Sequence, residues 1–203
     1  LHDKQSYGQG IAASVRDDLK KAGINVALFE GINAGDSDYS AVITKLKSAG
    51  ADFVYYGGYH PEMGLLLRQA AEQGLKVRMM GPEGVGNPEI NAIAGNAVEG
   101  MLVTLPADPA SKPENAALVK AFKDKGRDAS GAFQMGAYTA TQVLAQSIKA
   151  VGDDAEKVAD YLHKTAFNMP TGNVAWDAKG DLKAFDFPVY SWHKDGSKSV
   201  AEK

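Results

Sequence analysis

The strongest constraint on the fold is a repeated change in the period of the apolar residues along the first half of the chain. Apolar residues recur at helical spacing between positions 8 and 22: Ile11, Val15 and Leu19. Gly23 follows where a helix commonly ends. The next run, residues 24–29, is short, apolar and β-branched, as expected for a strand buried on both faces. A helix followed by such a strand is the unit from which parallel sheets are built.

The same alternation continues as far as residue 105. Helices are predicted at residues 38–49, 61–73 and 88–94. Strands are predicted at residues 52–56, 76–80 and 99–105. The sequence therefore predicts an α/β fold in which helices cover a parallel sheet.

The second half of the chain has a different organisation. Residues 106–113 contain three prolines among small and polar residues, which we interpret as a connection between two lobes. Helices are predicted beyond it at residues 114–125, 132–150 and 154–165. The chain is then predicted to form a β-hairpin, with strands at 172–176 and 185–192 around a turn at 177–181.

The first residues of the chain do not start a complete α/β unit. Leu1-His2-Asp3 has the character of the carboxyl end of a strand that leads into the helix at 8–22. Neither a strand nor a helix precedes these residues in the sequence. We therefore expect that an N-terminal region of the protein is absent.

Composition excludes several classes of function. The 22 Lys and Arg and 25 Asp and Glu residues give a net charge of −3 and are interspersed, which argues against a nucleic-acid surface or a basic membrane-binding helix. Apolar runs stay well short of the roughly 18 residues of a transmembrane helix, so direct membrane insertion is not expected. The lack of cysteine excludes a disulfide scaffold, a thiolate nucleophile and a Cys-ligated zinc site.

Motifs of the common enzyme classes are also missing from the sequence. There is no Gly-x-Ser-x-Gly elbow, and the glycine-rich residues 81–86 lack the spacing and the lysine of a phosphate loop. Histidines fall on four unrelated segments, which argues against a metal site and predicts surface or rim positions: His2, His60, His163 and His193. Several carboxylates are interpreted as solvated helix starts: Asp36, Asp38, Glu62 and Glu89. We predict neither an enzyme nor a cofactor.

The loops that follow the predicted strands contain the candidate binding residues. Ligands of open α/β sheets bind beyond the carboxyl ends of the strands, and Tyr7, Tyr59 and Glu83 all lie in such positions. A carboxylate and two phenols on one rim could hold an ammonium group and enclose an apolar side chain. The alternative is that each residue only belongs to the rim of a packed loop.

Four motifs, in order, carry a resemblance to a known family. They are HDKQSYGQG at 2–10, FVYYGGY at 53–59, GPEGVGN at 81–87 and WDAKGD at 176–181. Together with EGMLVT at 99–104, they closely resemble the leucine/isoleucine/valine-binding proteins of Gram-negative bacteria. The resemblance runs over essentially the whole chain.

The resemblance implies a type I periplasmic binding fold, in which two doubly wound parallel-sheet lobes are joined by crossing strands around a ligand cleft. Residues 1–106 would then form the second, C-terminal lobe without its first strands. Residues 107–186 would be the returning part of an incomplete first, N-terminal lobe. Residues 187–203 would return to the second lobe.

The resemblance also implies roles for individual residues. Glu83 would accept the ligand ammonium, Tyr59 would contact the ligand through its ring and hydroxyl, and Tyr7 would form a wall of the side-chain pocket. Phe133 would be the first lobe's aromatic contribution to that pocket; the alternative is an ordinary core phenylalanine. The groups that hold the ligand carboxylate would belong to the absent N-terminal segment.

The function implied is that of a periplasmic solute-binding component that captures leucine, isoleucine or valine. Its partners would be this small-molecule ligand, an inner-membrane ABC permease and the absent N-terminal segment of the same protein. A related sensor domain for amides or for another amino acid remains the alternative. A flavodoxin-like enzyme is disfavoured because no catalytic motif supports it.

Overall fold

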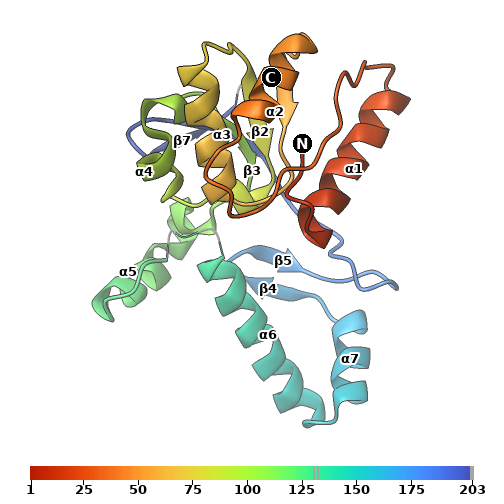
Figure 1. Ribbon diagram of the computed structural model, residues 1–203. Coiled ribbons are helices and arrows are strands. Elements are labelled where there is room, and N and C mark those ends of the chain that lie inside the picture. The colour runs from red at the N-terminus through yellow and green to blue at the C-terminus, as the bar shows by residue number, and fades with distance from the viewer. Residues whose placement is uncertain (130, 132, 202–203) are drawn as a thin grey trace. The chain divides into compact units, whose positions relative to one another are not determined.

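A computed structural model of the chain describes residues 1–129, 131 and 133–201 (Figure 1). The chain divides into two compact units. Unit 1 joins Leu1–Leu105 to the C-terminal segment that starts at Pro188, and unit 2 is Pro106–Phe187. The domain boundaries expected from the sequence, after residues 106 and 186, fall within one residue of these divisions.

Unit 1 is built on a five-stranded mixed sheet with the order β1-β2-β3-β6-β7. The strands are β1 (Phe53–Tyr55), β2 (Arg78–Gly81), β3 (Leu102–Thr104), β6 (Val189–Trp192) and β7 (Lys198–Val200). The first three are parallel, and β6 and β7 pair antiparallel to their neighbours. The α/β class and the parallel strand pairs predicted from the sequence are thus confirmed.

The helices of unit 1 follow the strands in the predicted alternation. They are α1 (Ser6–Lys21), α2 (Ser40–Ser48), α3 (His60–Glu72) and α4 (Ile90–Ala94), with short 3-10 turns η1 (Glu83–Val85) and η2 (Gly95–Val98). Helices α2, α3 and α4 pack in sequence, α3 between the other two. Their apolar sides form the core with the central strands: Ile43, Leu46, Met63, Leu66, Ile90, Val54, Met79 and Val103. Burial of this apolar surface is the main source of stability.

The prediction of a strand at residues 24–29 is wrong for the chain as it stands. This segment makes no ladder, and a single parallel bridge joins Gly31 to His2. His2 is also bridged to Gly57, so residues 1–3 lie between the two segments. The apolar composition is that of a strand, but residues 24–29 have no neighbouring backbone to pair with, and a strand requires one.

Unit 2 consists mainly of helices. It contains α5 (Ala116–Asp124), α6 (Gln134–Val151), α7 (Ala155–Lys164), two short 3-10 turns, η3 (Pro109–Ser111) and η4 (Pro113–Asn115), and a small hairpin of β4 (Phe167–Met169) and β5 (Gly172–Val174). Helices α6 and α7 pack together, and the ring of Phe167 lies between those of Tyr161 and Trp176. Ala132, at the start of one predicted helix, lies outside the described residues.

The predicted hairpin around residues 177–181 is also wrong. The turn itself forms, since the Asp177 amide donates to the Asp181 carbonyl and Trp176 is bridged to Leu182. However, β5 pairs with β4, and β6 pairs with β3 in unit 1. The partner strands β4 and β3 both lie outside the predicted hairpin. Each of these two ladders has three residue pairs, whereas Trp176 and Leu182 form an isolated bridge.

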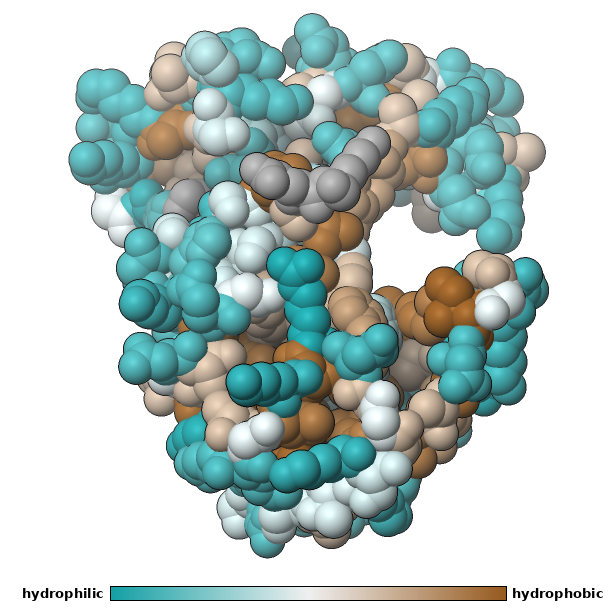
Figure 2. All heavy atoms as spheres, turned by 90° about the horizontal axis from the view of Figure 1, so that it is seen from above, coloured by the Kyte–Doolittle hydropathy of each residue, from teal (hydrophilic) through white to brown (hydrophobic). Residues whose placement is uncertain are grey.

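One face of the molecule is largely polar. The face seen in Figure 2 carries hydrophilic side chains over most of its area, with apolar residues in patches between them. Within the described residues, no helix has the length and apolar character needed to cross a membrane.

The buried amine of Leu1 predicts a pH dependence of stability. It donates to the Tyr55 carbonyl at 2.7 Å, and burial lowers its pKa from 8.0 to about 6. Between pH 8 and pH 6 the unfolded chain holds more protons than the folded chain, so the free energy of unfolding should fall by roughly 2 kcal/mol as the pH falls from 8 to 6. Denaturant unfolding of the 203-residue chain at both pH values measures this. An Nα-acetylated chain should lose most of the dependence, and equal dependence in both forms would contradict the assignment.

Candidate functional site

Three of the four predicted site residues lie at the carboxyl ends of the parallel strands of unit 1. Tyr7 is in the first turn of α1, four residues after Asp3, the last of the extended residues 1–3. Tyr59 follows β1 and precedes the first residue of α3. Glu83 follows β2 and is the first residue of η1. The parallel register of the strands brings these three loops to one edge of the sheet.

The three side chains contact one another. The Tyr7 hydroxyl donates a hydrogen bond of 2.8 Å to Glu83 Oε1. The rings of Tyr7 and Tyr59 have their centroids 5.5 Å apart and are tilted by 37°, a favourable aromatic arrangement. The three side chains therefore form one cluster, and its role in ligand binding stays a prediction. We call Tyr7, Tyr59 and Glu83 the YYE cluster.

Glycines allow the backbones beneath the YYE cluster to approach closely. A Cβ atom on Gly57 would collide with the carbonyl oxygen of Gly8, and one on Gly8 would collide with the carbonyl of Gly57. A Cβ atom on Gly84 would lie 2.6 Å from the Gly58 carbonyl oxygen. The glycines of three sequence motifs thus serve one purpose, which is to bring α1 and the two loops into backbone contact.

Burial and charge keep the phenols of this region protonated. Burial, followed by the hydrogen bond and the charge of Glu83, holds the pKa of Tyr7 far above its ordinary value. Burial and then the charge of Glu83 raise the pKa of Tyr55 to about 12. At neutral pH, Tyr7 is therefore a fixed donor that orients the Glu83 carboxylate.

One oxygen of Glu83 is left available for a ligand. Oε1 accepts from Tyr7, whereas Oε2 accepts no hydrogen bond from any residue in the described part of the chain. Glu83 is half-buried, and Tyr59 is 48% exposed at the rim. The YYE cluster therefore presents a carboxylate oxygen and aromatic surface to solvent, a combination that can bind a cation attached to an apolar group.

Phe133 lies in unit 2, immediately before α6, and its side chain is 59% exposed. The alternative that it is an ordinary core phenylalanine is therefore wrong. Its neighbours Ser130 and Ala132 lie outside the described residues. Its role in the ligand pocket stays a prediction.

Two polar residues differ from the sequence-based interpretation. Glu62 is not a solvated helix start: it is 8% exposed, and its Oε1 accepts from the Gly35 amide at 3.0 Å. His2 is not at the surface, because its ring stacks on that of Phe29 and it is 6% exposed. The hydrogen-bond partner of Glu62 lies 27 residues away, whereas Nδ1 of His2 accepts from the nearby Lys4 amide at 3.1 Å and only its ring contact comes from a distant segment.

Two features of the site were not predicted from the sequence: the hydrogen bond between Tyr7 and Glu83, and the position of Tyr55 as a third phenol close to the Glu83 charge. No group of three or more potential metal ligands occurs among residues 1–129, 131 and 133–201.

Comparison with known proteins identifies the family. A family model described as periplasmic binding protein matches residues 1–197. The chain is 59% identical over 200 residues to the leucine-, isoleucine-, valine-, threonine- and alanine-binding protein of Pseudomonas aeruginosa, covering 98% of this chain and 54% of that protein. It is 48% identical over 202 residues to the Leu/Ile/Val-binding protein of Citrobacter freundii, covering 100% of this chain and 55% of the relative.

A solved structure supports the same relationship. The crystal structure of a leucine-binding protein from Thermotoga maritima superposes with a TM-score of 0.86 at 31% identity, over 98% of this chain and 57% of that one. The chain thus spans about half the length of the relatives it matches. It has part of the type I periplasmic binding protein fold, and it belongs to the periplasmic binding protein family.

Proposed function

We propose that this chain is the larger part of a periplasmic solute-binding protein that captures leucine, isoleucine or valine and delivers it to an inner-membrane ABC permease. The observation that carries the proposal is the YYE cluster, in which Tyr7 orients Glu83 and Tyr59 packs beside it. The names of the Pseudomonas and Citrobacter relatives support branched-chain amino acids as the ligand class. They also favour transport over a sensor of amides.

The YYE cluster suits one half of a zwitterionic ligand. Oε2 of Glu83 accepts a hydrogen bond from the ligand ammonium, and the negative charge of Glu83 balances the charge of that ammonium. The rings of Tyr7 and Tyr59 enclose the aliphatic side chain and offer it no charged partner. The family resemblance assigns Phe133 a further apolar contact to the ligand side chain.

Partners for the ligand carboxylate are assigned to the N-terminal segment of the longer protein. In this proposal unit 1 is the second lobe, and unit 2 is the returning part of the first lobe. The chain acts as a binding protein and not as an enzyme. Membership of a periplasmic family supports a periplasmic location.

Replacing Glu83 by Gln in the complete two-lobed protein should weaken leucine binding by at least 100-fold. The reason is that the enclosed ammonium loses its counter-charge, a penalty of about 3 to 5 kcal/mol. Isothermal titration calorimetry measures it. The matched control is Glu89→Gln, because the Glu89 side chain is 77% exposed. An affinity of Glu83→Gln within threefold of the parent would remove Glu83 from the site.

Replacing Tyr7 by Phe should weaken leucine binding by about 10- to 100-fold. The variant keeps the ring but loses the hydroxyl that orients Glu83, and a hydrogen bond to a charged group contributes about 1.5–3 kcal/mol. The preference for leucine over valine should stay within threefold, because the aromatic wall is intact. Tyr161→Phe, on α7 of unit 2, is the control and should bind normally. Unchanged affinity of Tyr7→Phe would show that Glu83 needs no such support.

Competition experiments should show a strong preference for aliphatic over charged amino acids. The YYE cluster carries aromatic surface, and discrimination by one methylene among leucine, isoleucine and valine should stay at roughly 1–3 kcal/mol. Displacement of labelled leucine from the complete protein measures these differences. Aspartate or arginine binding as tightly as leucine would contradict the proposed pocket.

A further inference from the structure

A sharp turn joins the extended residues 1–3 to helix α1, and Tyr7 follows it in the first turn of that helix. Lys4, in this turn, has a φ angle of 62°, and it is the one non-glycine residue with a positive φ in the described part of the chain. This left-handed conformation is uncommon for a residue with a side chain, and it persists only where the surrounding contacts hold it. We call residues 2–5 the elbow.

Three side-chain hydrogen bonds hold the elbow within the described residues. Oδ1 of Asp3 accepts from the Gln5 amide at 2.9 Å, across the strained residue. Nδ1 of His2 accepts from the Lys4 amide at 3.1 Å, and the Lys4 ammonium donates to Oδ1 of Asn33 at 2.7 Å. The Asp3 bond spans Lys4 and ends at the residue that begins α1, so it is the bond that closes the turn.

The carboxylate of Asp3 also supplies a cap that α1 otherwise lacks. Gln5 is the N-cap residue of α1, and its side chain makes no capping hydrogen bond. The first N–H groups of a helix have no partner within the helix, so an acceptor from outside stabilises that end. A carboxylate suits this place because the N-terminus of a helix carries partial positive charge. Asp3 thus stabilises the turn of α1 that contains Tyr7.

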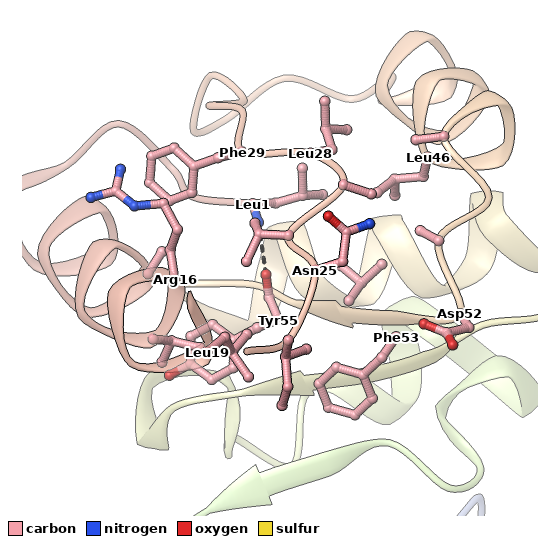
Figure 3. Close-up of a pocket in the computed structure, with 18 of the residues that line it drawn as sticks. Leu1, Arg16, Leu19, Asn25, Leu28, Phe29, Leu46, Asp52, Phe53 and Tyr55 are labelled. Carbon is pink, nitrogen blue, oxygen red and sulfur yellow. Dashed lines mark hydrogen bonds between the residues drawn. The ribbon is translucent and has the colours of Figure 1, made fainter. Parts of the chain in front are cut away.

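Residues 1–3 are attached to the end of β1. The Leu1 amine donates to the Tyr55 carbonyl at 2.7 Å, beside a cavity that residues 24–29 and the start of β1 line (Figure 3). The Gly57 amide donates to the Leu1 carbonyl at 3.0 Å, and the Asp3 amide donates to the Gly57 carbonyl at 3.1 Å. Asp3 therefore has a fixed position relative to Gly57, which precedes Tyr59 by two residues.

Asp3 is packed where the start of α1 meets the end of β1. It is 1% exposed, and a Cβ atom on Gly8 would collide with its Oδ1 and would lie 2.5 Å from the Gly57 carbonyl oxygen. The carboxylate thus fills the contact between the two elements. A movement of this carboxylate would displace Gly8, and with it the neighbouring Tyr7.

We propose that Asp3 is a positioning residue for the YYE cluster: its carboxylate closes the elbow and so holds the Tyr7 hydroxyl against Glu83. This role rests on the proposed function, because the YYE cluster is the proposed binding site. Asp3 acts from beneath the site, through the first turn of α1 and not through the ligand. The Tyr7 hydroxyl lies 2.8 Å from Oε1 of Glu83, so a small rotation of that turn would break the bond.

The two oxygens of Asp3 differ in their partners. Oδ2 is buried and accepts no hydrogen bond from the described residues, and such an atom lowers stability. Oδ1 alone joins the elbow to α1, so the role requires an acceptor at that place and not the negative charge. Asparagine has such an acceptor and caps helices about as well as aspartate does, whereas alanine has none.

The first test measures leucine binding to the complete two-lobed protein by titration calorimetry. Asp3→Ala should weaken leucine binding by about tenfold, the effect of losing a helix cap, and Asp3→Asn should stay within about threefold of the parent. In a Tyr7→Phe background, Asp3→Ala should add less than about threefold, because the hydroxyl that it positions is gone. A tenfold loss with Asp3→Asn, or an undiminished effect of Asp3→Ala in the Tyr7→Phe background, would overturn the role.

The second test needs no ligand, so it separates this role from the proposed function. In NMR spectra of the 203-residue chain, the ring protons of Tyr7 and Tyr59 should give mutual nuclear Overhauser effects in the parent and in Asp3→Asn. These effects should be lost in Asp3→Ala, while the amide shifts of Met80 and Val103 show that the sheet is intact. Their persistence in Asp3→Ala would mean that Tyr7 needs no such support, and the proposal would be wrong. If Asp3→Ala does not fold, Asp3→Asn decides: retained ring contacts support the role, and their loss overturns it.

Discussion

The backbone contact between Gly8 and Gly57 is the constraint on which the binding site depends. It joins the start of α1 to the end of β1 at a distance that no side chain would permit. Since Tyr7 directly precedes Gly8, and Tyr59 follows Gly57 by two residues, the contact also sets the distance between the two rings. The loop after β2 reaches the same place through Gly84 and Gly58.

Electrostatics then determines what this arrangement can bind. Burial, and then the neighbouring Glu83 carboxylate, raises the pKa of both Tyr7 and Tyr55, so neither hydroxyl competes with Glu83 as an anion. Tyr7 uses its proton to hold one oxygen of Glu83, and the second oxygen remains available. The same geometry that stabilises the loops therefore prepares an acceptor for a cationic group.

Secondary structure was predicted correctly from local sequence where short-range contacts determine it. The helices and the parallel strands β1, β2 and β3 follow from apolar periodicity, because each buries its apolar side within a few residues of the predicted bounds. The prediction was wrong for residues 24–29 and for the pairing of β6. A strand depends on a partner backbone, and neither partner could be identified from the segment itself.

The sequence by itself determined the α/β class, the place of Tyr7, Tyr59 and Glu83 after their strands, and the family, because motifs and periodicity are local properties. Only the tertiary structure decided that Tyr7 donates to Glu83, that Glu62 and His2 are buried, and that a cavity separates residues 24–29 from β1. Each of these joins segments more than twenty residues apart. Such long-range contacts depend on the tertiary fold, which no single segment of the sequence determines.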